Sequence, residues 1–133
     1  SEKVKPTILS DGTGGFQSKS EINKLIARPL TASMHKMHRA CQDNYYSKTF
    51  IKTGGQINDA EGLSKEELSR LPIRKLTPRE AFMLQGFPQD FVYKAHQADV
   101  SHGALYKQAG NAVSVNVVYG IMYYLIQNRI INE

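Results

Sequence analysis

An apolar stripe near the C-terminus is the feature that most constrains how this chain can fold. Apolar side chains recur there every four residues, which places them on one face of an α-helix. Gly120, on another side of the same helix, is small enough to permit close packing against a neighbouring backbone. The spacing therefore predicts a helix from about residue 113. The stripe consists of Val113, Val117, Ile121 and Leu125, widened by Val118 and Met122.

Two further short helices are predicted before this one. Ser64 followed by Glu67 has the spacing of a capping box, in which each side chain bonds the backbone N–H of the other residue. Pro72 prevents this helix from continuing. A second short helix is expected from Ser101 through Gln108, with the pair Gly110-Asn111 separating it from the C-terminal helix.

Start and stop signals also frame a helix after residue 76. Thr77 can cap it, Pro78 suits its first position, and Glu80 stands three residues after the cap. Gly86 then supplies a left-handed stop, and Pro88 bars continuation. The residues expected to lie in the core are Phe82, Met83 and Leu84.

Residues 1–58 are expected to be irregular. Asp11–Gly15 and Thr53–Gly55 are glycine-rich turn signals. Short strands are expected in three apolar runs, at residues 7–9, 26–31 and 45–51. These patterns predict an α+β chain in which a small, irregular, β-rich lobe is followed by helices.

The composition is that of one globular domain in a reducing compartment. The chain has 133 residues, of which 41% are hydrophobic. Its single cysteine, Cys41, cannot form an intrachain disulfide. No apolar run approaches the roughly 18 residues of a membrane span, and the polar N-terminus does not resemble a signal peptide. We therefore expect a soluble, cytoplasmic protein without a membrane partner.

All of the excess positive charge lies in the first half of the chain. The net charge is +5. Residues 1–58 carry nine Lys or Arg and four Asp or Glu, whereas residues 59–133 carry eight of each. A basic lobe beside a neutral one suits a polyanionic partner. A merely soluble basic surface is the other interpretation of the same charge.

Two segments of the second half go beyond generic patterns. The first is Arg74–Glu80 with its continuation Leu84–Pro88, and the second, about twenty residues on, is Tyr106–Val113. In order and spacing they resemble the last two conserved blocks of the DNA (cytosine-5) methyltransferases. Upstream, Gly14–Gln17 resembles the glycine-rich first recognition loop of that family, and Leu30–Ser33 resembles its threonine-containing second element.

The resemblance implies three parts. Residues 1–73 would form the target-recognition region, residues 74–92 the helix block that supports it, and residues 93–133 a helical segment that joins the cofactor-binding domain. These helices would complete a Rossmann-like methyltransferase domain whose larger N-terminal half, with the catalytic Pro-Cys dipeptide, is missing. No catalytic residue and no metal site is therefore expected here. Cys41 follows Ala40 instead of proline and is expected to be a packing or loop residue.

The resemblance also implies which residues meet double-stranded DNA. Glycines let backbone approach DNA closely, and Lys19 can neutralise a phosphate. Gln17 and Arg28 have donors suited to the edges of adenine and guanine, respectively. Thr31 suits a phosphate or sugar contact, with a buried strand threonine as the alternative. The full set of DNA-binding candidates is Gly14, Gly15, Gln17, Lys19, Arg28 and Thr31.

Gly110, Asn111 and Ala112 are the candidate contacts to S-adenosyl-L-methionine, because in the family this block helps to enclose that cofactor. The Asn111 side chain can also cap the following helix, which is compatible with a cofactor contact. Arg79 and Glu80 are expected to have structural roles, with Arg79 holding the recognition region against the catalytic part.

The expected function is DNA recognition and closure of the cofactor pocket in an enzyme that methylates cytosine in duplex DNA, inactive without its catalytic half. That half, as the principal partner, would belong to the same chain or to a separate subunit, and the serine at position 1 slightly favours a fragment. The alternatives are a non-catalytic DNA-binding or regulatory module and a protein-interaction subunit that docks through the apolar helix. Restriction–modification is the expected setting.

Overall fold

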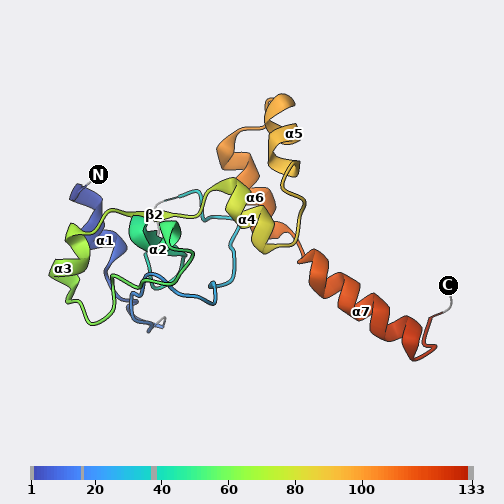
Figure 1. The fold of residues 1–133 in the computed structure, drawn as a ribbon, viewed down its shortest axis with the longest axis horizontal. Helices are drawn as coiled ribbons and strands as arrows, with labels where there is room; N and C mark the ends of the chain where they lie inside the picture. The colour runs from blue at the N-terminus through green and yellow to red at the C-terminus, as the bar shows by residue number, and fades with distance from the viewer. Residues whose placement is uncertain (1, 16, 37–38, 132–133) are drawn as a thin grey trace.

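An irregular lobe is followed by a helical part, and the last helix extends away from both (Figure 1). The computed structural model describes residues 2–15, 17–36 and 39–131. The elements are, in order, the 3-10 helix η1 (Glu2–Val4), α1 (Lys5–Ile8), β1 (Tyr45–Ser47), α2 (Lys48–Lys52), α3 (Lys65–Arg70), β2 (Ile73–Lys75), α4 (Pro78–Leu84), α5 (Phe91–Gln97), α6 (His102–Asn111) and α7 (Val115–Gln127).

A two-stranded antiparallel sheet ties the lobe to the segment that leads into α4. In its register Tyr46 lies opposite Arg74, and Ser47 lies opposite Ile73. The chain therefore returns to the lobe at Ile73–Lys75, just before α4. The core of the lobe is formed by Leu9, Ile22, Ala40, Tyr45 and Leu68.

Strands account for less of the lobe than the sequence predicts. The run at 45–51 is a strand only in its first part, because the Ser47 hydroxyl accepts a hydrogen bond from the Phe50 N–H and so caps α2. The run at 7–9 lies at the end of α1, and residues 26–31 are irregular. Within the described residues the prediction of a β-rich lobe is wrong, whereas the α+β class agrees with the helices and the small sheet.

Side-chain hydrogen bonds take the place of a larger sheet in the lobe. The Asn23 amide nitrogen donates to Asn58 Oδ1 and Asp59 Oδ1, each at 3.0 Å, and Asn23 Oδ1 accepts from the Ser47 N–H at 2.7 Å. The Ser47 hydroxyl donates to Asp59 at 2.5 Å. Asn23 and Ser47 are buried, so these bonds satisfy polar groups that would otherwise be costly. They hold together three loops that are distant in sequence.

The second core lies among α4, α5 and α6. Phe82, Phe87 and Phe91 form a cluster with ring centroids 4.8 to 5.2 Å apart. Leu105 and Ala109 of α6 are fully buried against it. The lobe contributes to this core as well, since its Met34 is buried in the same cluster.

The predicted helix boundaries before residue 90 are confirmed. Ser64 and Glu67 form the capping box of α3, and Thr77 and Glu80 form that of α4, with Pro78 in the first turn. Gly86 has a φ of 82°, the left-handed conformation expected of the residue that ends a helix. Both short helices are therefore fixed by local signals.

The boundary between α6 and α7 differs from the prediction. The sequence predicts that Gly110-Asn111 separates two helices, but α6 continues through Asn111 and the break falls at residues 112–114. Asn111 does not cap α7, whose N-cap residue is Ser114, without a side-chain hydrogen bond. A glycine at position 110 is required by close packing rather than by a turn, because its backbone lies against Thr31.

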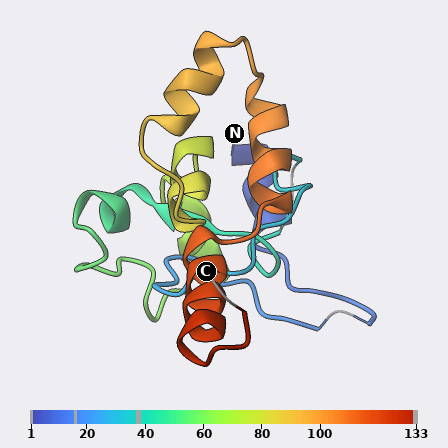
Figure 2. The same ribbon diagram turned by 90° about the vertical axis from the view of Figure 1, so that its right-hand side faces the viewer.

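Helix α7 lies against very little of the chain. None of its residues is buried, and Ile121, in the middle of its stripe, is 54% exposed. A Cβ at Gly120 would meet open space, so the close packing expected there does not occur within the described residues. Figure 2 looks along α7 from its C-terminal end, and the remaining elements lie behind this helix.

One segment bears on the expectation that the chain has no membrane span. The segment His102–Gln127 is long and apolar enough to cross a membrane by length and composition alone. The core helices of soluble proteins pass the same test, and here residues 112–114 interrupt the segment. Its first half, α6, buries Leu105 and Tyr106 in the core. The structure therefore divides the segment into a core helix and an exposed helix.

Replacement of Leu105 by alanine is expected to lower the free energy of unfolding by about 2–5 kcal/mol, because it opens a cavity in the second core. Leu84→Ala, a matched change at a side chain that is 50% exposed, should cost less than about 1 kcal/mol. Urea unfolding of the two variants measures the difference. Equal losses would contradict the position of this core.

Candidate functional site

The segments Arg74–Pro88 and Tyr106–Val113 meet at Gln85. Its side-chain amide donates to the carbonyls of Ala109 and Ala112, at 3.1 and 3.3 Å. Its backbone carbonyl accepts a hydrogen bond from the Val115 N–H at 2.8 Å. Carbonyls at the end of α6 and the first N–H of α7 thus find partners on one residue. Gln85 fixes the direction in which α7 leaves the body.

Glu80 is a second point at which the first segment is tied together. Its carboxylate accepts hydrogen bonds from both terminal nitrogens of Arg74, at 2.7 and 2.8 Å. It also accepts hydrogen bonds from the Thr77 N–H and hydroxyl, at 2.7 and 2.9 Å. The hydrogen bonds from Arg74, aided by those from Thr77, lower the pKa of Glu80 to about 2. Because Arg74 also pairs with Tyr46 across the sheet, Glu80 links α4 to the lobe.

Arg74, which was not singled out from the sequence, ties α4 to the lobe, whereas the role expected of Arg79 toward the catalytic part stays a prediction. Arg79 is exposed and donates to Gln89 at 3.0 Å, on the loop between α4 and α5. The bidentate pair of Arg74 with Glu80 was missed by sequence reasoning. The sequence signal that could have indicated this pair is the position of Arg74, six residues before the capping Glu80.

Lys75 joins three segments that are distant in sequence. Its ammonium donates to the carbonyls of Met34 and His35, at 3.3 and 3.0 Å, and lies 4.9 Å from the centre of the Tyr106 ring. The Tyr106 hydroxyl in turn donates to the Leu76 carbonyl at 2.6 Å. Nothing in the residue pattern distinguished this lysine from a solvated one, so sequence reasoning missed it.

The glycine-rich loop projects from the lobe (blue, Figure 2). Gly14, with a φ of 66°, and Gly15 are exposed and have no neighbours within 4 Å of a Cβ position. Gln17 and Lys19 are exposed on the same loop, whereas Phe16 lies outside the described residues. The four described candidates therefore share one projecting surface.

Asp11 anchors the base of this loop. Its carboxylate accepts from the Ser20 N–H at 2.7 Å and from Lys65 at 2.6 Å, and the Lys65 hydrogen bond lowers its pKa. The Asp11 carbonyl accepts from Arg39 at 2.9 Å, and the Gly12 N–H donates to the Ser18 carbonyl. The loop between residues 12 and 18 is therefore closed at its base, and among its described residues Gly14 and Gly15 face open space.

The Arg28 side chain is engaged by contacts within the lobe. Its side chain is 17% exposed, and its guanidinium donates to the Lys19 carbonyl and to Glu21, both at 3.3 Å. Its backbone exchanges two hydrogen bonds with the Asn44 side chain. In this conformation Arg28 orders the lobe, and it would have to leave these partners to read a base edge.

Thr31 and Gly110 are brought together. Thr31 is exposed, its hydroxyl lies 3.5 Å from Asp43, and its backbone lies in a turn rather than a strand. The Thr31 peptide contacts the last turn of α6 at Gly110. Asn111 and Ala112 follow, with the Asn111 side chain exposed. A candidate for DNA and the candidates for the cofactor thus lie side by side.

Cys41 is buried, with 1% of its surface exposed, as expected of a packing residue. Its thiol is therefore not accessible to a substrate. Among the described residues no group of three or more His, Cys, Asp or Glu could hold a metal ion.

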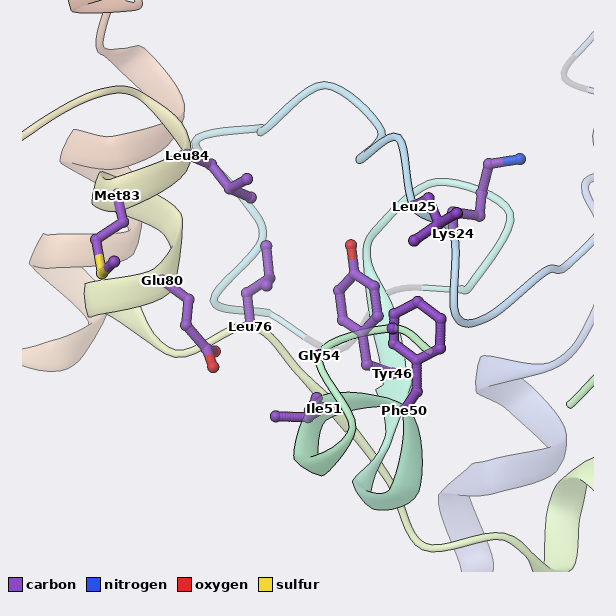
Figure 3. A pocket seen from close by; sticks show the side chains of 11 residues that line it. Lys24, Leu25, Tyr46, Phe50, Ile51, Gly54, Leu76, Glu80, Met83 and Leu84 are labelled. Carbon is purple, nitrogen blue, oxygen red and sulfur yellow. The ribbon is translucent and has the colours of Figure 1, made fainter. Parts of the chain in front are cut away.

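An open apolar groove of about 450 Å³ separates the lobe from α4 (Figure 3). Tyr46, Phe50 and Leu76 line it together with Met83 and Leu84. The last two residues are 43% and 50% exposed, so the prediction that they belong to the core is wrong, whereas Phe82 is buried. Their side of α4 faces the groove because Phe82 takes the face that packs on α6.

The sequence of the chain matches a known family. The model of the family described as C-5 cytosine-specific DNA methylase matches residues 5–127. The orphan methyltransferase M.SPBetaI of Bacillus phage SPbeta is 31% identical over 135 residues, covering 99% of this chain and 30% of that protein. No solved structure matches the chain at a significant level.

Shorter matches point the same way. The orphan methyltransferase M.SPRI of Bacillus phage SPR is 40% identical over 75 residues, which cover 56% of this chain and 17% of that protein. The type II methyltransferase M.Bsp6I of Bacillus sp. (strain RFL6) is 52% identical over 46 residues, 35% of this chain and 13% of that protein. The chain therefore spans less than a third of the length of these relatives.

The Glu80 contacts predict how acid acts on the fold. A carboxyl whose pKa falls from 4.5 to about 2 on folding stabilises the folded state above pH 4.5, and this contribution is lost as the pH falls from 4.5 to 2. Because the Glu80 side chain is 34% exposed, solvent screening reduces the contribution to about 1–2 kcal/mol. Glu80→Gln should lose this stability at pH 7 and show a weaker dependence on acid.

Glu67→Gln is the matched control, since Glu67 occupies the same position in the capping box of α3 and forms no bidentate arginine pair. Thermal unfolding between pH 2 and 7 measures both variants. A Glu80→Gln protein with the acid dependence of the unaltered chain would contradict the assignment.

Proposed function

We propose, since this chain belongs to the C-5 cytosine-specific DNA methylase family, that it recognises DNA and closes the cofactor pocket of a DNA (cytosine-5) methyltransferase. It would be the C-terminal part of that enzyme and would be inactive without the catalytic part. Residues 1–73 would form the target-recognition region, and residues 74–92 would support it. Residues 93–133 would complete a Rossmann-like domain, most of which lies outside this chain.

The observation that carries the proposal is the exposure of α7. At 100° per residue, apolar side chains occupy all of its circumference except a strip formed by Asn116, Gly120 and Gln127. A helix that is apolar on nearly all sides is stable in water only when it is enclosed. The chain covers 30% of M.SPBetaI, so the larger part of such an enzyme is available to enclose it.

The projecting loop supports the DNA half of the proposal. A cytosine within a duplex must be flipped out before it can be methylated, which costs a few kcal/mol that contacts elsewhere have to offset. Gln17 and Lys19 are exposed, on and directly after a loop whose base is fixed by Asp11. Lys19 suits a phosphate and Gln17 suits a base edge. Arg28 would hold the loop that carries them.

The residues at the end of α6 fit a polar cofactor in part. Asn111 presents an exposed amide beside the turn at residues 112–114, and this group can bond the polar end of S-adenosylmethionine. The face of Gly110 is occupied by Thr31, and the Ala112 carbonyl already accepts from Gln85. S-Adenosylmethionine would supply the methyl group. In this chain Asn111 would help to hold it, and Gln85 would keep the turn in place.

The proposed setting is the bacterial cytoplasm. Two of the relatives are named orphan methyltransferases and a third is named a type II methyltransferase. Both names are compatible with DNA methylation, with or without a restriction endonuclease. Because the thiol of Cys41 is buried, the cysteine that attacks cytosine would come from the catalytic part.

The test is transfer of labelled methyl groups from S-adenosylmethionine to mixed-sequence duplex DNA. The chain alone should give no incorporation, and addition of the catalytic part should restore it. Ile121→Asp should abolish this restoration without lowering the stability of the isolated chain, since Ile121 is 54% exposed and belongs to neither core cluster of the described residues. Gln127→Asp, on the polar strip of the same helix, is the control and should retain activity.

Two results would redirect the proposal. Methyl transfer by the verified chain alone would overturn it, and Cys41 would be the first residue to replace. DNA binding that decreases with salt, with no response to the cofactor or the catalytic part, would favour the alternative of a non-catalytic DNA-binding module.

A further inference from the structure

Gly110 makes an unusually close contact between backbones. It lies in the last turn of α6 with an ordinary helical conformation. A Cβ built on it would come well within 3.0 Å of the Thr31 carbonyl group and the Ala32 nitrogen, closer than real Cβ atoms approach other atoms. Gly103, the other glycine of α6, has nothing within 4 Å of such a Cβ. Only the contact with Thr31 requires glycine in this helix.

The segment that rests on Gly110 is a tight turn held from a second side. Within it, the Met34 N–H donates to the Thr31 carbonyl at 3.1 Å and the Lys36 N–H donates to the Ser33 carbonyl at 2.9 Å. The Met34 side chain is buried in the second core. Lys75 donates to two carbonyls of the same turn. The turn from Thr31 to Lys36 is therefore held between α6, through its contact with Gly110, and the hydrogen bonds of Lys75.

The outer side of this turn is polar and basic. Thr31, His35 and Lys36 are exposed, and the first half of the chain, to which they belong, carries all of its excess positive charge. The inner side is the backbone that contacts Gly110. A polyanion that binds the outer side and shifts this turn would therefore also displace the last turn of α6 and Asn111, the next residue.

We propose that Gly110 is a positioning residue for the DNA-recognition turn Thr31–Lys36 and couples that turn to the cofactor side of α6. The proposal rests on the proposed function and assigns to Gly110 a role other than cofactor contact. DNA that orders the turn also fixes the end of α6, so DNA and cofactor each strengthen binding of the other by the same factor. The glycine is needed because any side chain would push turn and helix apart.

The experiment compares Gly110→Ala with Gly103→Ala in the chain joined to its catalytic part. The first readout is hydrogen exchange of the amides from Thr31 to Lys36. The second is the dissociation constant for duplex DNA with and without S-adenosylhomocysteine. Gly110→Ala should weaken DNA binding roughly tenfold or more and remove most of the effect of S-adenosylhomocysteine, because overpacking displaces the turn. Gly103→Ala should leave both readouts unchanged.

A structural role alone would not change the coupling. If Gly110→Ala is folded and binds DNA with unaltered affinity and unaltered response to S-adenosylhomocysteine, the proposal is overturned. If that variant does not fold, Lys75→Met loosens the same turn without adding a clash. It should accelerate exchange from Thr31 to Lys36 and reduce the coupling, and unchanged coupling in this variant would also overturn the proposal.

The result is separable from the proposed function. If the unaltered protein binds no DNA, the proposed function fails at that step, before either variant is compared. If the unaltered protein binds DNA and methylates it, and both glycine variants behave alike, the proposed function stands and the role of Gly110 is wrong.

Discussion

The hydrogen bonds of Gln85 determine how α7 is placed relative to α4 and α6. One side chain satisfies carbonyls at the end of α6, and the carbonyl of the same residue receives the first N–H of α7. Each bond contributes only about 1 kcal/mol, but all three act on a break of three residues. These bonds therefore stabilise the break between α6 and α7 in the observed conformation. As a consequence, α7 leaves with its apolar surface exposed.

Local signals explain what the sequence predicted correctly. The capping boxes of α3 and α4 depend on residues three positions apart, so Ser64 with Glu67 and Thr77 with Glu80 are visible in the sequence. The four-residue period of α7 is equally local. The strands were predicted less well, because β1 ends where Ser47 caps a helix. Ser47 is both the last residue of β1 and the N-cap of α2, and its hydroxyl stabilises the start of the helix instead of a longer strand.

Contacts between distant segments explain what the sequence did not provide. The ties from Arg74 to Glu80 and from Lys75 to Met34 depend on the sheet that brings the lobe to α4. The closeness of Gly110 to Thr31 spans nearly eighty residues, and a glycine after a helical run resembles a turn. Residue type alone marked Arg28 for DNA, whereas in the fold its guanidinium is occupied by Glu21. The sequence therefore identified candidate functional residues, but it did not identify the residues that they contact in the fold.

The most direct measurement of the central claim is hydrogen exchange of the α7 amides, from Val115 to Gln127, in dilute chain alone and in the presence of the catalytic part. An exposed helix without a partner opens readily, so its amides should exchange much faster than those of α6 in the chain alone. Protection should rise to the level of α6 when the catalytic part is added. Equal protection of α7 and α6 in the monomeric chain alone would contradict the claim that the catalytic part encloses α7. So would unchanged protection of α7 after the catalytic part is added, in a preparation that methylates DNA.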